Sequence, residues 1–280
     1  MKKEIILNVK EPSELLKLMY AEIKGVPKGK IKSFLEHRQV SVNGIVTTKF
    51  NHPVKSGDTV KISTGEGTRE TRGIKIVYED EWIVAVNKPS GLLTVATDRE
   101  KEKTAYALLS ENRRGKLFVV HRLDRDTSGV LLFAKSYEIK EALQEDWNDR
   151  ILLREYLAVC EGSFESKKGV CKSFIAENSA HIMYSAREGK LAITEYEVLR
   201  ENAEYSYVKL NLRTGRKNQI RVHMKELGNP VVGDKKYGST KNPIGRLGLH
   251  AVRLGFIHPV SGEELIVKAD PERKFTLPKK

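Results

Sequence analysis

The charged loop that decides the fold of this chain is Val120-His121-Arg122-Leu123-Asp124-Arg125-Asp126-Thr127-Ser128-Gly129. The apolar residues 117–120 lead into it, and a second apolar run, 130–134, leads out. Short apolar runs bounded by turn residues are typical of buried strands. We therefore expect a rigid scaffold to present the carboxylate of Asp124 on a loop crowded with cations. On charge pattern alone, a solvated turn between two strands is the more ordinary interpretation.

The composition favours a globular protein that binds a polyanion. The 280 residues allow one or two domains with a sizeable core. Fifty Lys and Arg against 37 Asp and Glu give a formal net charge of +13, and nucleic acid is the commonest partner of such a chain. We find no long amphipathic helix with a basic face, which argues against an anionic membrane surface. Aromatic residues make up only 7%, which argues against a platform of stacked rings for single strands.

The sequence gives no sign of export, membrane insertion or metal binding. The opening apolar run is too short for a signal peptide, and no window approaches a membrane span, so we expect a cytoplasmic protein. Cys160 and Cys171 match no zinc or redox motif. His223, His250 and His258 have no mutual spacing typical of metal ligands, and we expect structural or RNA-contact roles for them.

Residues 12–63 have the pattern of a small α+β domain. An amphipathic stretch follows Ser13, which is a plausible helix cap, and Gly25 ends it. A second, lysine-rich helix is predicted from Lys28 to about residue 37. Asn43-Gly44 then predicts a hairpin between two short strands, and a further strand is predicted at 60–62.

The rest of the chain predicts a larger α+β domain. Residues 64–73 contain almost nothing to bury, so we divide the chain into a domain at 1–66, a linker at 67–73 and a domain at 74–280. Many strands and few helices favour a large, mostly antiparallel mixed sheet with flanking helices and loops. The strands are predicted at 74–78, 82–87, 117–120, 130–134, 152–161, 191–199 and 205–212.

Three helices and one irregular region complete this prediction. The helices are expected at 104–112, from Ser136 through Trp147 with Ser136 as its cap, and from the turn at 214–216 to Gly228. Residues 163–190 are polar and are expected to be irregular.

The first domain resembles the S4 RNA-binding domain. The resemblance rests on the basic helix, Val-x-Val-Asn-Gly at 40–44 and Val-x-x-Gly-Asp-x-Val-x-Ile at 54–62. Glu14-Leu15-Leu16 departs from the usual Arg-Leu-Asp opening of the first helix. The resemblance implies that the second helix and the hairpin lie against structured RNA, with contacts from Lys28, Lys30, Lys32, His37 and Arg38. A solvated lysine face is the alternative.

Nearly the whole chain resembles the RluA-type RNA pseudouridine synthases. Beside the opening loop, the motifs that carry this resemblance are Val-Asn-Lys-Pro-Ser-Gly-Leu at 86–92, Arg-Glu-Tyr-Leu-Ala at 154–158, Thr-Gly-Arg-Lys-Asn-Gln-Ile-Arg-Val-His at 214–223, Pro-Val-Val-Gly-Asp at 230–234 and Leu-His-Ala at 249–251. Lys217-Asn218 departs from the commoner Thr-His, which puts substrate contacts in doubt.

The resemblance implies that uridine in RNA is isomerised without a metal or another cofactor. It gives Asp124 the essential role, and a carboxylate can either add covalently to the substrate or stabilise positive charge on the sugar. It makes Arg221 the partner that keeps this carboxylate ionised. Tyr156 would stack on the extruded uracil and assist removal of the C5 proton, although a tyrosine in mid-strand is often only part of a core.

Further residues are expected to contact the RNA. The space that a flipped uridine leaves must be braced, and His121 and Arg122 are the candidates. Phosphate contacts are expected from Lys88, Arg125, Arg216 and Lys217, and a substrate contact from Thr127. The S4-like domain favours ribosomal over transfer RNA as the structured RNA partner, and we expect a monomer.

Two other functions compete with this one. The chain can be an RNA-binding protein that is catalytically silent. It can also be a glycoside hydrolase that pairs Asp124 with a second acid such as Glu155. Since Glu155 precedes Tyr156 on a strand, the two side chains point to opposite faces, which argues against the hydrolase.

Overall fold

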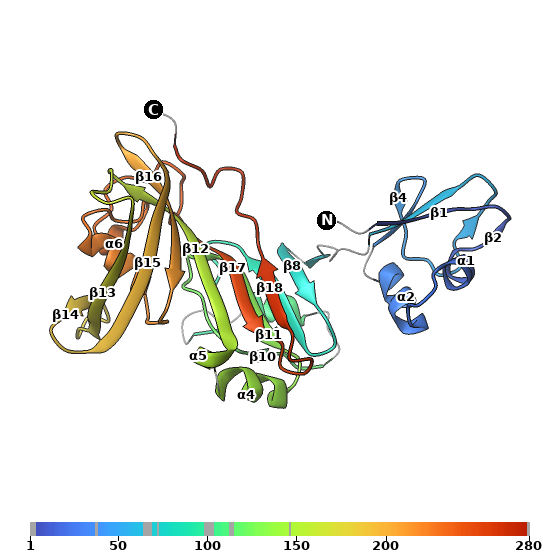
Figure 1. The fold of residues 1–280 in the computed structure, drawn as a ribbon, viewed down its shortest axis with the longest axis horizontal. Helices are drawn as coiled ribbons and strands as arrows, with labels where there is room; N and C mark the ends of the chain where they lie inside the picture. The colour runs from blue at the N-terminus through green and yellow to red at the C-terminus, as the bar shows by residue number, and fades with distance from the viewer. Residues whose placement is uncertain are drawn as a thin grey trace. The chain divides into compact units, whose positions relative to one another are not determined.

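The computed structural model describes residues 4–36, 39–63, 69–71, 73–97, 104–111, 115–145 and 147–278. The chain forms two compact units, Met1–Glu70 and Thr71–Lys280 (Figure 1). Each unit has hydrophobic core clusters of its own. Within the described ranges, the helices are too short or too polar to cross a membrane.

The first unit packs two helices against a small sheet. Its sheet has the strand order β1-β6-β3-β4, and β2 pairs with β5 beside it. Leu15, Met19 and Ile31 of the helices are buried against the strands. The elements are β1 (Glu4–Asn8), β2 (Ser13–Glu14), α1 (Leu15–Glu22), α2 (Lys28–Glu36), β3 (Val40–Val42), β4 (Ile45–Val46), β5 (Pro53–Val54) and β6 (Thr59–Ser63).

Local signals predicted this unit well, with one error. Asn43 and Gly44 both have positive φ, 49° and 83°, as the predicted two-residue hairpin turn requires. Ser13 is not the cap of α1, because the chain is still extended there and pairs with Val54. The cap position is Glu14, which makes no side-chain capping hydrogen bond. Pairing between strands therefore took precedence over local capping.

The second unit is an α+β domain around one large mixed sheet, as predicted. Its strand order is β14-β13-β15-β16-β12-β17-β11-β9-β8-β7, with β10 on β11 and β18 on β17. β11 and β17 pair in parallel. The strands are β7 (Arg69–Thr71), β8 (Ile74–Glu79), β9 (Ile83–Lys88), β10 (Phe118–Val119), β11 (Ser128–Ala134), β12 (Ile151–Glu161), β13 (Lys168–Glu177), β14 (Met183–Ala186), β15 (Lys190–Glu201), β16 (Tyr205–Leu212), β17 (Leu249–Ile257) and β18 (Glu264–Lys268).

The strand that follows the charged loop is the centre of this sheet. Every residue of β11 is buried, which explains its unbroken apolar sequence. At its start, Gly129 has φ +116°, and a Cβ there would lie 2.1 Å from the carbonyl oxygen of Ala251. Only glycine permits this close approach of β11 to β17.

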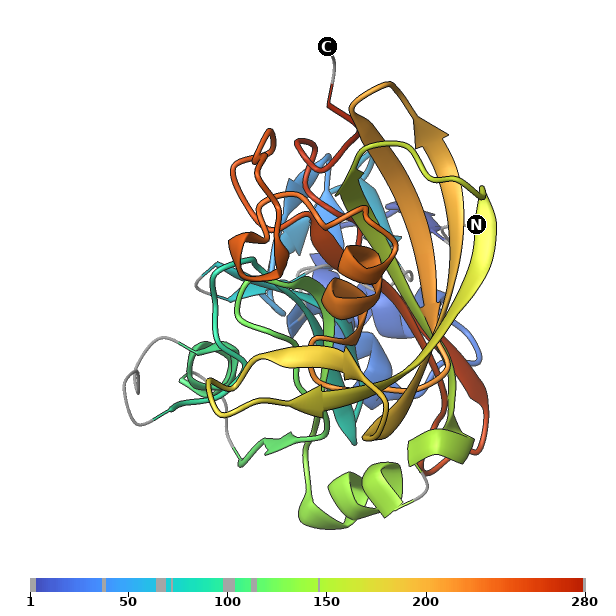
Figure 2. The same ribbon diagram turned by 90° about the vertical axis from the view of Figure 1, so that its left-hand side faces the viewer.

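The helices pack at several places along the sheet. They are α3 (Ala105–Ser110), α4 (Tyr137–Glu145), α5 (Trp147–Arg150), α6 (Gln219–Glu226) and the 3₁₀ turn η1 (Lys235–Tyr237). Helix α6 packs against β14 and β15, α4 against β10 and β11, α5 against β12 and α3 against β8. Figure 2 shows α4 and α5 (green) together at the bottom of the view, apart from α6 (orange). The Ile139 N–H donates to the Ser136 hydroxyl at 3.3 Å, so Ser136 caps α4 as predicted. The helix predicted to continue through Trp147 is instead divided into α4 and α5.

Two expectations about irregular segments were wrong. Residues 163–190 contain β13 and β14, which form one edge of the sheet. In β13 only Cys171 and Ile175 are buried, so the polar residues between them hide the alternation that marks a strand. The expected linker 67–73 contains β7, a three-residue strand next to β8.

Candidate active site

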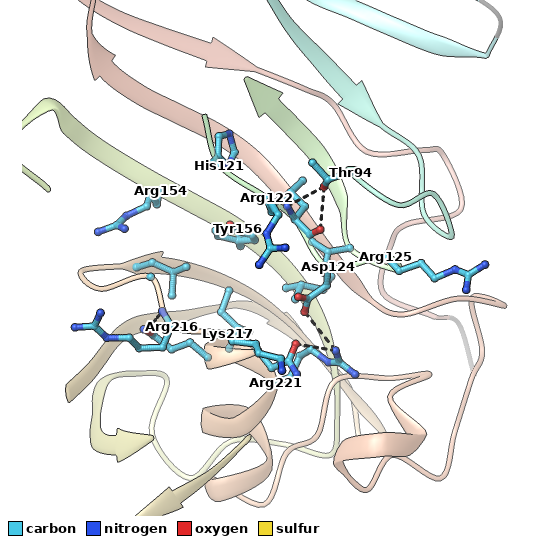
Figure 3. A pocket seen from close by; sticks show the side chains of 18 of the residues that line it. Thr94, His121, Arg122, Asp124, Arg125, Arg154, Tyr156, Arg216, Lys217 and Arg221 are labelled. Atoms are coloured by element: carbon cyan, nitrogen blue, oxygen red, sulfur yellow. Dashed lines mark hydrogen bonds and ion pairs between the residues drawn. The ribbon is translucent and has the colours of Figure 1, made fainter. Parts of the chain in front are cut away.

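A pocket of about 520 Å³ lies beside the charged loop of the second unit. Residues 121–125 face the segment 215–221 across it, with Tyr156 between them (Figure 3). The structure thus brings together most of the predicted site residues, namely His121, Arg122, Asp124, Arg125, Thr127, Tyr156, Arg216, Lys217 and Arg221.

Hydrogen bonds from a neighbouring loop hold the charged loop in place. The Thr94 hydroxyl donates to the Leu123 carbonyl at 3.1 Å and accepts from the Leu123 N–H at 3.2 Å. The Ser90 hydroxyl donates to the carbonyl of Asp126 at 2.7 Å. Both the residue before Asp124 and the turn after it are therefore fixed by residues outside the loop, as a preorganised site requires.

Lys88 has a different position from the phosphate contact predicted for it. Its side chain is completely buried, and its ammonium donates to the carbonyls of Pro89, Leu92 and Arg125 at 3.1, 2.7 and 2.8 Å. Burial lowers the pKa of Lys88 to about 7, while the charges of Asp126 and Asp124 oppose that decrease. All three N–H donors of the charged form are occupied, so Lys88 joins two loops instead of meeting a phosphate.

Asp124 and Arg221 form a single, long contact. Arg221 Nη1 lies 3.3 Å from Asp124 Oδ2. The Asp124 side chain is 32% exposed and that of Arg221 is 14% exposed, so solvent and substrate reach the carboxylate more readily than the guanidinium. The pair is oriented but leaves one carboxylate oxygen without a contact to Arg221.

The other donors of Arg221 are taken by residues behind it. Its Nε and Nη2 donate to the two oxygens of Asp234 at 2.7 and 2.8 Å, and its Nη1 also donates to Asn218 Oδ1 at 3.1 Å. The guanidinium lies 4.7 Å from the centre of the Tyr237 ring. Burial acts against the charge of Arg221, but hydrogen bonds and charge from Asp234, joined by Asp124, raise its pKa above the ordinary value.

Asp234 is the residue of this site that sequence reasoning missed. In the sequence it is only the last residue of the Pro-Val-Val-Gly-Asp motif at 230–234. Its side chain is 1% exposed, and it lies just before η1, where its carboxylate also accepts from the N–H of Tyr237 at 3.3 Å. A buried acid needs a charged partner, so an aspartate at the end of an apolar motif was the signal that could have predicted a buried ion pair.

Tyr156 lines the pocket from β12. Burial raises the pKa of Tyr156 to about 12, the charge of Asp124 adds to the effect, and Arg154 opposes it. The phenol is therefore protonated at neutral pH and can donate a hydrogen bond. Glu155 points to the opposite face, where Arg253 Nε donates to it at 2.8 Å. Glu155 is thus absent from the pocket lining, as its position next to Tyr156 predicted.

The His121 ring is tied to β11, and its role in bracing the stack that a flipped uridine leaves stays a prediction. Its Nε2 accepts from the N–H of Leu132 at 3.1 Å, which ties the ring to β11. Burial, with Arg154 adding to it, lowers the pKa of His121 to about 4, so the ring is neutral. Arg122 beside it is less constrained, because it is exposed and has no ion-pair partner among the described residues.

The other predicted RNA contacts lie around the pocket rim. Arg125 Nε donates to the Gly91 carbonyl at 3.2 Å, and Arg216 Nε donates to the Leu191 carbonyl at 2.9 Å, yet both side chains are exposed. Lys217 Nζ lies 2.5 Å from Glu177 Oε1, so phosphate must compete with an ion pair there. Thr127 is 2% exposed, and its hydroxyl has no hydrogen-bond partner in the described part of the chain.

The predicted RNA contacts of the first unit lie outside this pocket. Lys28 and Lys32 are exposed on α2, with their ammonium groups 5.7 and 5.1 Å from the rings of Tyr20 and Phe50. Lys30 is also on α2. His37 and Arg38 lie outside the described residues.

The three histidines that were expected to have structural or RNA-contact roles, and not to bind metal, have protein partners. The ring of His223 is hydrogen-bonded to Thr194 Oγ1 at 2.8 Å, and His250 Nδ1 to Ser128 Oγ at 2.7 Å. His258 Nε2 lies 3.0 Å from Asp80 Oδ2. Across the residues that the structure describes, no three His, Cys, Asp or Glu side chains form a metal-binding group.

The second unit thus combines a large mixed sheet with a pocket that holds a carboxylate, an arginine and a half-buried tyrosine among further cationic side chains. The sequence model of the family described as RNA pseudouridylate synthase matches residues 82–226, which include Asp124, Tyr156 and Arg221. The chain belongs to this family. It is an RNA pseudouridine synthase, and therefore an isomerase.

Individual relatives match at about one residue in three. The chain is 32% identical to an uncharacterized RNA pseudouridine synthase, YhcT, of Bacillus subtilis, over 95% of this chain and 92% of the relative. It is 33% identical to ribosomal large subunit pseudouridine synthase C of Pasteurella multocida, over 92% and 87%. It is 34% identical to tRNA pseudouridine synthase C of Haemophilus influenzae, over 72% of this chain and 95% of the relative.

Solved structures agree with the fold. The structure of human RNA pseudouridylate synthase domain containing 1 is 28% identical in sequence, with a TM-score of 0.60. The match covers 72% of this chain and 85% of that chain.

Proposed function

We propose that this enzyme converts specific uridines of structured RNA to pseudouridine with Asp124 as its catalytic carboxylate. The observation that carries the proposal is the 3.3 Å contact between Arg221 Nη1 and Asp124 Oδ2, while Nε and Nη2 of the same guanidinium donate to Asp234. A carboxylate that lies beside a fixed cation and keeps one oxygen free of it can still meet the substrate.

The reaction moves a base without adding or removing atoms. The N1–C1′ bond of uridine breaks, the uracil rotates, C5 bonds to C1′, and the C5 proton is lost while N1 gains one. Asp124 supplies negative charge at the sugar or the base, as a nucleophile or as a counter-charge, and both roles require the ionised form. Tyr156 supports the base with its ring and places a protonated hydroxyl near Asp124.

The substrate uridine reaches the pocket by leaving its stack, which costs a few kcal/mol. Arg122 fits the task of bracing the gap, because it lines the pocket, is exposed and has no ion-pair partner among the described residues. The rim residues Arg125, Arg216 and Lys217 fit contacts with the flanking phosphates.

Ribosomal RNA is the preferred substrate class in this proposal, with the first unit as an S4-like RNA-binding domain. Two observations support it. The ribosomal relative covers 92% of this chain, whereas the tRNA relative covers 72% of this chain but 95% of its own length. The first unit also exposes Lys28 and Lys32 on α2, the helix expected to lie against RNA. Replacing both lysines by Ala should weaken binding to ribosomal RNA and reduce its salt dependence, while kcat stays the same.

The decisive experiment maps pseudouridines across total RNA from cells that lack this gene. Restoring the wild-type gene should restore pseudouridine at defined sites of large-subunit ribosomal RNA, and Asp124→Asn should restore none while still binding that RNA. If the wild-type protein restores no pseudouridine in any RNA, the chain is a silent RNA-binding protein. If Asp124→Asn is as active as the wild type, Asp124 is not the catalytic carboxylate.

A further inference from the structure

The end of the pocket away from Asp124 has no part in the proposed reaction. His121 and Arg154 lie at this end, separated from Asp124 and Arg221 in Figure 3, and Trp147 and Arg216 also line it. A smaller cavity, lined by Trp147, His121, Arg154 and Tyr156 among others, adjoins the same side chains. The pocket therefore extends past the place where a single uracil meets Tyr156.

Arg154 supplies an uncompensated positive charge at this end. Its Nη2 donates to the carbonyl of Arg213 at 2.9 Å, but none of the described carboxylates pairs with it. Burial lowers the pKa of Arg154, Tyr156 opposes this decrease, and the nearby charge of Arg216 adds to it. Two arginines that repel each other in a partly buried pocket are a site for an anion, and phosphate suits the guanidinium fork.

The local backbone is shaped to admit this arginine. A Cβ on Gly215 would lie 2.9 Å from Arg154 Nη1, so any other residue at 215 would push the guanidinium away. Gly215 begins the segment 215–221 that lines the pocket, and it has an ordinary φ. Gly215 therefore leaves room for the guanidinium of Arg154 in the position that it occupies.

Trp147 and His121 supply an aromatic wall beside that charge. Their ring centres are 5.4 Å apart, with an angle of 37° between the planes. The His121 ring is fixed, because its Nε2 accepts from the N–H of Leu132, and its other nitrogen then carries a hydrogen. Trp147 is half-buried, so part of the indole is packed against the core and part faces the pocket. The part of the Trp147 indole that faces the pocket, held beside the fixed His121 ring, is a stacking surface for a base.

We propose that Trp147, His121, Arg154 and Arg216 form a subsite for a second nucleotide, the strand neighbour of the target uridine. The base stacks on Trp147, and the phosphate lies between Arg154 and Arg216. The inference rests on the proposed function, because it needs a uridine at Tyr156. It makes Trp147 a residue that selects substrate RNA by its sequence neighbour, whereas Asp124 and Arg221 act on the target uridine.

Synthetic RNA hairpins that carry the mapped uridine test this subsite. One hairpin is intact, and two others lack the base on the 5′ or the 3′ side of the target. For the wild type, one abasic hairpin should have a KM about 5- to 140-fold higher, the range that corresponds to about 1–3 kcal/mol of base stacking. Trp147→Ala should show that increase with the intact hairpin and no further increase with the abasic one.

The conservative variant separates stacking from packing. Trp147→Phe keeps a ring and should restore most of the affinity together with the sensitivity to the abasic neighbour. If Trp147 only caps the core, Trp147→Ala and the abasic change act independently and their effects on KM multiply. That result, or a wild type that is insensitive to both abasic hairpins, overturns the subsite.

Intrinsic fluorescence gives a second readout that needs no turnover. The chain has two tryptophans, and Trp82 is not part of the pocket lining but packs 5.5 Å from the ring of His258. In Trp82→Phe, emission comes from Trp147 alone, and binding of the intact hairpin should quench it more than binding of the abasic hairpin. Equal emission changes would refute stacking on Trp147. A failure of the wild type to form pseudouridine in any RNA refutes the proposed function instead.

Discussion

Two carboxylate–arginine pairs of the second unit differ in how the arginine is shared. Glu155 and Arg253 form a closed pair, in which Nε donates to Oε1 at 2.8 Å and Nη2 to Oε2 at 2.5 Å. Asp124 receives only Nη1 of Arg221, at 3.3 Å, because the fork of Arg221 is committed to Asp234. The closed pair joins β12 to β17, whereas the open pair leaves a carboxylate oxygen for chemistry.

The difference between the two pairs comes from Asp234, a carboxylate that binds Arg221 in addition to Asp124. An arginine free to turn would close on Asp124 as Arg253 closes on Glu155, and both oxygens would then be occupied. Asp234 prevents this from a buried position, and Tyr237 and Asn218 fix the same guanidinium from other sides. Four predictions test this comparison.

The largest effect should come from removing the arginine of the open pair. Arg221→Met leaves Asp124 without its cation and Asp234 as an unpaired buried acid. We expect kcat to fall by roughly 10³-fold, at the upper end for the loss of one charged donor in an active site. The measurement is single-turnover pseudouridine formation on the mapped RNA. An activity within tenfold of the wild type would show that the open pair is not essential.

The second prediction concerns a substitution that should bring the open pair of Asp124 and Arg221 closer to a closed one. Asp234→Asn weakens the hold on the Arg221 fork, which should turn toward Asp124, and kcat should fall by roughly 10- to 100-fold, as for small displacements of a reacting group. Because a buried pair is broken, the free energy of unfolding should also fall by about 3 kcal/mol. A matched loss of stability with unchanged kcat would mean that Asp234 serves the fold only.

The third prediction uses pH to detect the charge of Asp124 at Tyr156. Because the pKa of Tyr156 is raised to about 12 in the folded protein, its neutral phenol contributes stability that is complete below pH 10 and is lost as pH rises toward 12. Asp124→Asn should move the end of this window to lower pH, and Glu155→Gln should not. Chemical unfolding between pH 8 and 12 measures it, and identical profiles for all three proteins would contradict it.

The smallest effect should come from opening the closed pair. The Arg253 side chain is 41% exposed, so solvent screens its attraction to Glu155. Glu155→Gln should reduce the free energy of unfolding by about 1 kcal/mol or less and leave kcat within about threefold. A large loss of kcat would show that the two faces of β12 are coupled, and the comparison would then fail.

The sequence predicted the positions of the residues that lie in short motifs. The loop around Asp124, the strand of Tyr156 and the helix of Arg221 were each placed from local patterns, and the pocket brings them together. Charge patterns could not show burial, which is why Lys88 was taken for an RNA contact. Asp234 was missed because its contact with Arg221 depends on how η1 packs beside α6.

The errors in the fold have the same origin. β13 was missed because much of its inward face is polar, including Ser173, which is hydrogen-bonded to the buried His223. When the inward-facing side chains of a strand are polar and make hydrogen bonds, the strand lacks the apolar alternation that sequence patterns detect. Central strands such as β11, which are buried on both faces, were predicted correctly because their apolar runs are continuous.

The large sheet has two halves, which are joined at Gly129 by the short parallel pairing of β11 with β17. Two residue pairs, Ser128 with His250 and Gly129 with Ala251, connect β11 to β17. The strands from β14 to β17 lie on one side of this joint, and those from β11 to β7 on the other. Asp124 belongs to the β11 side, and Arg221, on α6 beside β14 and β15, belongs to the other. A bend between these two halves would therefore change the distance between Asp124 and Arg221.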